Sequence, residues 1–268
     1  MSRNSPVALW RRFLALPNDS RTKTLGVAFL VSLVAAIAVS TTSVALKSRQ
    51  EAHVQAAREA KLAAMVATLP GLADVMRETG AQSLQTVIVA MDTGQIDPTK
   101  DAATFDFLTA QSDVTQSKPL AASDDPAKIG QRPNLAPVYI LRGTEGLALV
   151  VLPVYGTGYQ STIRAYLALH GDLTTIAALS IYEQGETPGL GARITDPAWQ
   201  ALWSGKRTLD DQGEVTITVV RGAASTPTQV DGITGATRST TGVTNLVQFW
   251  LGDLGYGPFL ARLKAEEF

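Results

Sequence analysis

The segment VYILRGTEGLALVVLPVYGTGYQSTIRAYLALHGDLTTIAALSIY, residues 138–182, contains four successive runs rich in Val, Ile, Leu and Tyr. The runs cover residues 138–142, 147–155, 162–169 and 174–182, and Gly, Asp or charged residues bound them. Short runs of this composition predict β-strands. Since strands grouped together with helices around them are typical of segregated folds, the sequence predicts an α+β domain with a largely antiparallel sheet and flanking helices.

Further elements are predicted on both sides of this segment. Residues 85–90 (QTVIVA) and 215–220 are short strand-like runs. Residues 196–205 begin with Asp-Pro, a typical helix start, and end with Gly, a typical stop. A final helix is predicted at residues 239–251, because apolar residues recur there with helical spacing. These apolar residues are Val243, Leu246, Val247, Trp250 and Leu251.

Residues 91–136 differ from the rest of the domain in composition. They are rich in Asp, Thr, Ser, Lys and Pro and show little periodicity. This pattern predicts a long surface excursion. Contact with another protein and a simple solvated loop both remain open for it.

Composition limits the chemistry of the chain. With 268 residues, 45% of them hydrophobic and 18% charged, a packed core is expected. The net charge of -1 gives no general attraction to nucleic acid. The absence of Cys excludes disulfides, thiolate-ligated iron–sulfur clusters and a cysteine nucleophile. His53 and His170 lie far apart in sequence, so no metal site is predicted, and any redox chemistry requires a bound organic cofactor.

Residues 24–46 (TLGVAFLVSLVAAIAVSTTSVAL) carry no charged side chain. As a helix they extend roughly 34 Å at about 1.5 Å per residue, which is enough to cross a bilayer. The alternative is a signal peptide, but the run exceeds a normal hydrophobic region and no convincing cleavage site follows. Residues 47–69 instead continue with helix-forming residues up to Pro70. The sequence therefore predicts one transmembrane helix that emerges as a continuous helix.

Basic residues predict the orientation of this helix. Before it lie Arg3, Arg11, Arg12, Arg21 and Lys23; after it lie Lys47, Arg49, Arg58 and Lys61, interleaved with Glu51 and Glu59. The bias toward the amino-terminal side places residues 1–23 in the cytoplasm and residues 47–268 in the periplasm. A single-pass protein of the bacterial inner membrane is therefore expected, in contact with the lipid bilayer.

Two glycine-containing segments are the candidates for chemistry. The first, DGITGAT, runs from Asp231 to Thr237 and directly precedes the final predicted helix. Small residues allow a ligand to approach the backbone, and a helix amino terminus favours a phosphate, here on Thr237. The alternative is an ordinary capping loop. The second segment, EQGETPGLG at residues 183–191, follows a predicted strand and suits a loop against a flat ring, or an ordinary Gly/Pro turn.

The DGITGAT segment resembles the flavinylation motif of proteins that carry FMN through a phosphoester to threonine. Together with EQGETPGLG and the ending FWLGDLGYGPFL at residues 249–260, the sequence resembles the family of the C subunit of the Na⁺-translocating NADH:quinone reductase. The resemblance covers nearly the whole chain, including the basic amino terminus, the single span and DPAKIGQRPN at residues 125–134.

This resemblance implies a covalent FMN on Thr237, placed there from FAD by a periplasmic flavin transferase. Asp231, Thr234, Gly235 and Ala236 would form the recognition motif around it. The chain would relay electrons between redox centres of partner subunits, on the way from NADH to ubiquinone, within a redox-driven sodium translocase. It would bind neither NADH nor quinone, and no catalytic residue beyond the flavin is expected.

The resemblance also implies that the second segment lies beside the isoalloxazine. The residues concerned are Glu186, Thr187, Leu190 and Gly191, with Thr187 and Leu190 as the contacts.

Residues 155–160 (YGTGYQ) depart from the family pattern. The family usually has lysine at Thr157 and Leu-Trp at Tyr159 and Gln160, which leaves flavin contact by this loop open. The G subunit of an Rnf-type ferredoxin:NAD⁺ oxidoreductase is therefore an alternative, although length and ending favour the quinone reductase. A non-redox, membrane-anchored scaffold is the alternative from another class.

Overall fold

The computed structural model describes residues 10, 11, 14, 15, 17, 20–37, 40, 84–102, 104–144 and 146–265. The chain divides into two compact units, Met1–Ala64 and Met65–Phe268.

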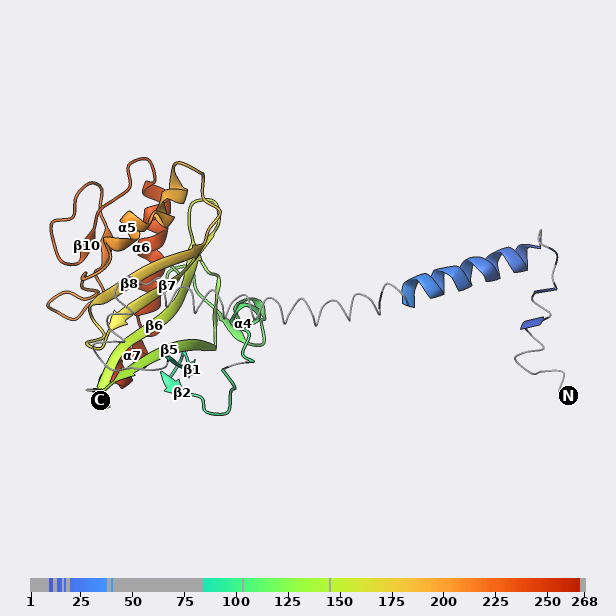
Figure 1. The fold of residues 1–268 in the computed structure, drawn as a ribbon, viewed down its shortest axis with the longest axis horizontal. Helices are drawn as coiled ribbons and strands as arrows, with labels where there is room; N and C mark the ends of the chain where they lie inside the picture. Colours follow the sequence, from blue (N-terminus) through green and yellow to red (C-terminus); the bar gives the residue numbers. More distant parts are fainter. Residues whose placement is uncertain are drawn as a thin grey trace. The chain divides into compact units, whose positions relative to one another are not determined.

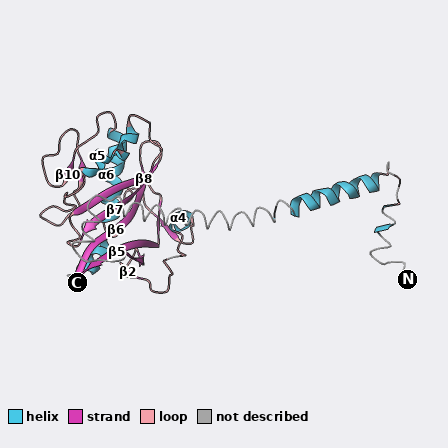
Figure 2. Ribbon diagram, viewed as in Figure 1, coloured by secondary structure: helices cyan, strands magenta, loops and turns pink. Residues whose placement is uncertain are grey.

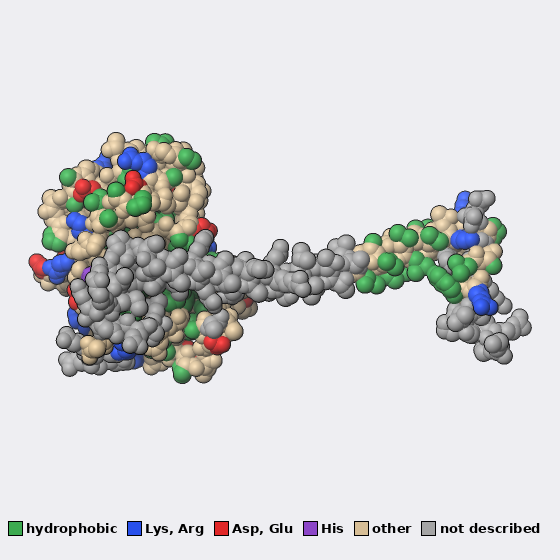
Figure 3. Space-filling view, in the orientation of Figure 1, with side chains coloured by type: hydrophobic (Ala, Val, Ile, Leu, Met, Phe, Trp, Pro, Cys, Tyr) green, Lys and Arg blue, Asp and Glu red, His purple; other side chains and the backbone are tan. Residues whose placement is uncertain are grey.

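In the amino-terminal unit, residues 21–37 form a helix (Figure 1). Hydrophobic side chains are exposed along much of it (Figure 3). Among the described residues, no helix combines the length and the apolar character needed to cross a membrane. Residues 38, 39 and 41–46 of the predicted span lie outside the described residues, as do the predicted helix at 47–69 and most of residues 1–19.

The carboxy-terminal unit is built on one six-stranded sheet (Figure 2). Its order is β2-β1-β5-β6-β7-β8, and every neighbouring pair is antiparallel. The strands are β1 (Leu84–Ala90), β2 (Gln95–Ile96), β5 (Leu135–Gly143), β6 (Gly146–Thr157), β7 (Thr162–His170) and β8 (Ile176–Glu183). The five predicted strands that fall in this sheet are confirmed, with ends shifted by a few residues. The prediction of an α+β domain with a largely antiparallel sheet is confirmed for this unit.

The core lies between the sheet and helix α6 (Thr237–Leu251). Alternate residues of β6, namely Val150, Leu152 and Val154, are at most 1% exposed and belong to the same hydrophobic cluster as the buried side chains of α6. Every second residue of a strand faces the same side of the sheet, so these three side chains share the side that packs on α6. The indole Nε1 of Trp250 donates a hydrogen bond to the carbonyl of Tyr155 over 2.7 Å, so α6 is fixed on β6 by polar as well as apolar contacts.

Shorter helices complete the unit: α4 (Phe107–Ser112), the 3₁₀ helix η1 (Gly191–Thr195), α5 (Pro197–Ala201) and α7 (Gly257–Ala265). The predicted helix start is confirmed, because the Asp196 side chain accepts a hydrogen bond from the N–H of Ala198. α7 was not predicted, since the Gly- and Pro-rich ending masks its periodicity. Its docking is marked by Tyr256, which is fully buried and donates its hydroxyl to the carbonyl of Pro153 over 2.9 Å.

Residues 91–136 are more structured than the predicted surface excursion. They contain β2, α4 and a hairpin of β3 (Ser117–Pro119) and β4 (Gln131–Pro133). Aspartates stabilise local turns, which periodicity does not reveal. Asp106 accepts from the N–H groups of Leu108 and Thr109 at the start of α4. Contact of this segment with another protein stays a prediction.

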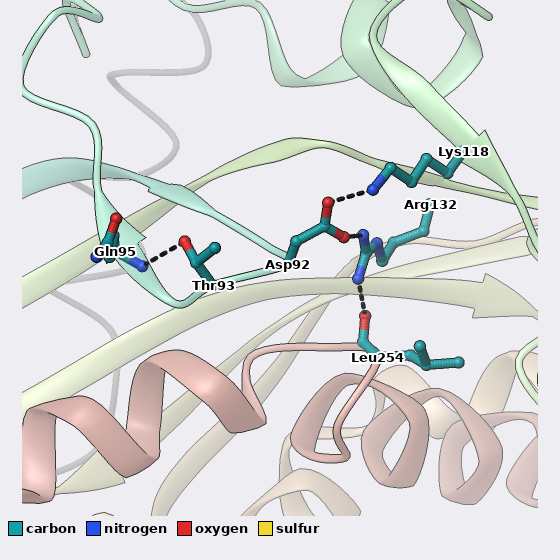
Figure 4. Close-up of polar contacts among 6 residues, drawn as sticks. All are labelled: Asp92, Thr93, Gln95, Lys118, Arg132 and Leu254. Carbon is teal, nitrogen blue, oxygen red and sulfur yellow. Dashed lines mark hydrogen bonds and ion pairs between the residues drawn. The ribbon is translucent and has the colours of Figure 1, made fainter.

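A buried arginine joins this segment to the connection that follows α6 (Figure 4). Arg132, only 4% exposed, bonds to the carboxylate of Asp92 and donates to the carbonyl of Leu254 over 3.0 Å. Lys118 pairs with the other oxygen of the same carboxylate. These contacts connect the β1–β2 turn, the β3–β4 hairpin and the connection between α6 and α7.

The strand predicted at residues 215–220 is much shorter in the structure. Only Thr218–Val219 (β9) is a strand, and it pairs in parallel with Gln229–Val230 (β10) outside the main sheet. Side chains of α6 form hydrogen bonds with backbone groups of residues 217 and 219 instead. Gln248 donates to the carbonyl of Ile217, and the Thr244 hydroxyl accepts from the N–H of Val219.

Candidate functional site

Three segments meet at the start of α6, and the Glu186 carboxylate joins them. One oxygen accepts hydrogen bonds from the N–H groups of Tyr159, Gln160 and Ser161 at 3.1, 3.0 and 3.2 Å. The other accepts from the hydroxyl of Ser239, in the first turn of α6, at 2.5 Å. The turn between β6 and β7, the loop between β8 and η1, and α6 are thus held together through one side chain.

The surroundings of Glu186 favour its charged form despite its burial. The side chain is 4% exposed. Burial alone would raise the pKa of the carboxyl, but the hydrogen bonds from Ser239, Gln160, Ser161 and Tyr159 outweigh it, and the pKa lies below its ordinary value. No cation takes part in this set of contacts, so oriented N–H and O–H dipoles stabilise the carboxylate.

Two glycines allow these segments to approach so closely. A methyl group at Gly191 would collide with the Oγ of Ser239 on α6, and it would lie 3.0 Å from both the Cβ and a carboxylate oxygen of Glu186. A methyl group at Gly242, on α6, would lie 2.9 Å from the Cα of Gly158 and from the carbonyl oxygen of Thr157. The loop before η1 and the β6–β7 turn therefore both rest directly against α6.

Thr237 is the first residue of α6 and is exposed. The capping position belongs to Ala236, which has no side-chain acceptor, so Thr237 is not the helix cap. Within the described residues, nothing accepts a hydrogen bond from the backbone N–H groups of Thr237, Arg238 or Ser239. Unpaired N–H groups and the positive end of the helix dipole favour an anion here. The geometry and donor set suit a phosphate on the Thr237 hydroxyl.

The other residues of the first motif lie around this start. Thr234 and Gly235 are exposed, and Ala236 is 4% exposed and donates its N–H to the carbonyl of Ile233. Asp231 faces the preceding loop instead. Its carboxylate accepts from the N–H of Ala224 at 2.7 Å, and its carbonyl accepts from the indole of Trp199 at 2.8 Å. Asp231 therefore fixes the base of the motif.

The second motif lies beside the first. Leu190 is 49% exposed, and its Cδ2 lies 3.3 Å from the position that a Cβ on Gly235 would take. The carbonyl of Thr187 accepts from the N–H groups of Leu190 and Ala192, both at 3.1 Å, which closes the turn. An exposed apolar side chain thus lies close to the loop before α6, an arrangement that suits the flat ring of a ligand.

The segment 155–160 is divided between two places. Tyr155, Gly156 and Thr157 line a cavity of about 330 Å³ together with Gln111 and Arg164, and Thr237 is not among its lining residues. Tyr159 and Gln160 are held at the start of α6 through Glu186. Sequence reasoning missed this link and the role of Ser239. A serine two residues after Thr237 was the available signal, because such a side chain points back along the helix.

Comparisons with known proteins cover the region that contains this site. The FMN-binding domain family matches residues 158–252, which include both motifs. The C subunit of the Na(+)-translocating NADH-quinone reductase from Vibrio vulnificus is 39% identical over 249 residues, covering 92% of this chain and 97% of that protein. The corresponding subunit from Pseudomonas aeruginosa is 36% identical over 256 residues, covering 93% and 98%.

Solved structures show the same fold. The crystal structure of NqrC from Shewanella oneidensis has a TM-score of 0.65 at 35% identity, covering 72% of this chain and 88% of that one. The crystal structure of the same subunit from Parabacteroides distasonis, 24% identical, has a TM-score of 0.51 over 71% and 83% and shows likeness of fold alone.

Proposed function

Because this chain belongs to the family of the Na(+)-translocating NADH-quinone reductase C subunit, we propose that it is the FMN-bearing, electron-carrying subunit of such a complex. The match extends over almost the full length of the relatives. This supports the quinone reductase over the G subunit of an Rnf-type complex. The FMN-binding domain supports a redox carrier over a non-redox scaffold. The other subunits of a redox-driven ion translocase are its expected partners.

The proposed attachment point of FMN is Thr237, through a phosphoester. The observation that carries this proposal is its exposed hydroxyl at the start of α6, beside three N–H groups that have no acceptor among the described residues. In transfer from FAD, the Thr237 Oγ–P bond forms, the phosphoanhydride bond breaks, AMP leaves and the hydroxyl proton is released. A periplasmic flavin transferase is the proposed catalyst. FMN, once bound, accepts and releases electrons.

The residues of the chain then serve to hold and orient the flavin. Glu186 fixes the two loops against α6, and Asp231 fixes the base of the attachment loop. Leu190 and Thr187 are proposed to contact the ring: Leu190 offers an exposed apolar surface next to that loop, and the carbonyl of Thr187 closes the turn that carries both. No proton transfer is required of any of them, which suits an electron carrier.

A membrane anchor is also proposed. Its support is the uncharged run at residues 24–46, with basic residues concentrated before it, and the exposed hydrophobic side chains in the described part of residues 24–37. In this arrangement residues 1–23 lie in the cytoplasm, and the FMN-binding domain lies in the periplasm of a bacterial inner membrane.

The test is to purify the assembled complex from its native membrane through a tag on this chain. We expect a flavin that stays with the chain on a denaturing gel, and whose absorbance in the native complex falls on addition of NADH and returns on addition of quinone. If this chain carries no flavin in the assembled complex, the proposed carrier function is wrong. A flavin that NADH leaves oxidised would refute its place in the electron path.

A further inference from the structure

Arg238 directly follows Thr237, and its guanidinium lies over the ring of Tyr159, with Cζ 4.9 Å from the ring centroid. The two side chains come from segments that Glu186 ties together. The N–H of Tyr159 donates to that carboxylate, and so does the hydroxyl of Ser239, the residue after Arg238. A positive charge is therefore held on the residue that follows the proposed flavin attachment point, in the first turn of α6.

This charge lacks a counter-ion within the described part of the chain. Arg132, Arg164 and Arg207 each pair with a carboxylate, but no carboxylate lies within ion-pair distance of Arg238. The nearby charge of Glu186 is already stabilised by its own hydrogen bonds. A cation–π contact at an exposed site contributes only about 0.5–1 kcal/mol. The stack on Tyr159, whose side chain is 51% exposed, leaves the guanidinium donors available.

We propose that Arg238 is the counter-ion of the phosphodiester on Thr237, and that Tyr159 holds its guanidinium in place. This inference rests on the proposed attachment of FMN to Thr237. A phosphodiester between threonine and flavin keeps one negative charge on its two non-bridging oxygens. The planar fork of a guanidinium matches two such oxygens, which a lysine ammonium cannot do. Arg238 is thus a positioning residue for the phosphate and takes no part in electron transfer.

Tyr159 gains a defined role in this arrangement. Glu186 fixes the backbone of Tyr159 through hydrogen bonds to its N–H, while the face of the Tyr159 ring supports the Arg238 guanidinium. The ring therefore acts on the flavin through Arg238, without needing to contact the isoalloxazine. An aromatic residue in the β6–β7 turn therefore has a structural role in holding Arg238.

The test is ³¹P NMR of the full chain, loaded by co-expression with a flavin transferase and kept in a phosphorus-free detergent. The same protein in denaturant gives the shift of the free phosphodiester. We expect Arg238→Gln to move the native resonance most of the way to the denatured position. Arg238→Lys and Tyr159→Leu should move it part of the way. Lys264→Gln, which removes an exposed charge from α7, should leave it in place.

The outcomes separate this inference from the function on which it rests. A phosphodiester resonance that is the same in Arg238→Gln and in the unaltered protein would overturn the role of Arg238. A resonance unaffected by Tyr159→Leu would overturn the supporting role of the ring. Absence of any protein-bound phosphorus in the unaltered chain, given an active transferase, would refute the attachment to Thr237 itself.

Discussion

Substitution of Glu186 by Gln changes the side chain little in size, but it should destabilise the domain strongly. The carboxylate accepts three backbone N–H groups and the hydroxyl of Ser239. Hydrogen bonds to a charged group contribute about 1.5–3 kcal/mol each, against about 1 kcal/mol between neutral groups. Gln keeps one acceptor oxygen for the N–H groups but turns an amide nitrogen toward Ser239. The expected loss is therefore about 2–4 kcal/mol of unfolding free energy.

Urea unfolding, followed by tryptophan fluorescence, measures this loss. Glu183→Gln is the matched control, because Glu183 is 60% exposed and pairs with Arg164 only at 3.5 Å. A long ion pair whose carboxylate is at the surface contributes at most about 1 kcal/mol. Equal midpoints for Glu186→Gln and Glu183→Gln would refute the reasoning that Glu186 holds the three segments together.

Other contacts give further predictions. Because the pKa of Glu186 in the folded protein lies below its ordinary value of 4.5, the charged form adds stability at pH values well above 4.5. This stability is lost as pH falls through the pKa of the folded state, so the difference in unfolding free energy between the unaltered protein and Glu186→Gln should narrow on acidification. A difference that widens would contradict this. Gly191→Ala crowds Ser239 and Glu186, and it should cost about 1–3 kcal/mol of unfolding free energy while reducing flavin attachment; unchanged stability and attachment would argue against close packing there. Trp250→Phe leaves the buried carbonyl of Tyr155 without its donor and should cost about 1–3 kcal/mol by thermal or urea unfolding; an unchanged midpoint would show that this hydrogen bond does not hold α6 on β6.

The sheet was predictable because its strands carry the signal in their own residues. Runs such as TIRAYLAL at residues 162–169 alternate buried and half-buried positions over much of their length, so composition and spacing reveal them directly. The polar contacts that order residues 91–136 were not predictable, because Arg132 contacts Asp92 and Leu254, which lie far from it in sequence. The same reason hides the hydrogen bond between Glu186 and Ser239, which lie 53 residues apart.

The two motifs were identified by their residues, and the structure adds how they meet. Sequence alone offered Thr237 as either a cap or an attachment point, and the helix starts with Ala236 in the capping position. Leu190 beside Gly235 and Glu186 beside Ser239 bring the second motif to the first. Such contacts depend on how the loops pack on α6, and no local pattern encodes them.

The most direct test of the attachment site is a denaturing gel viewed under ultraviolet light after co-expression with a flavin transferase. The unaltered chain is compared with Thr237→Val and with Thr241→Val, an exposed threonine one turn later on α6. Fluorescent bands are expected for the unaltered chain and Thr241→Val, and a dark band is expected for Thr237→Val. A fluorescent Thr237→Val band, or dark bands throughout with a transferase that is active on a control substrate, would contradict attachment of the flavin to Thr237.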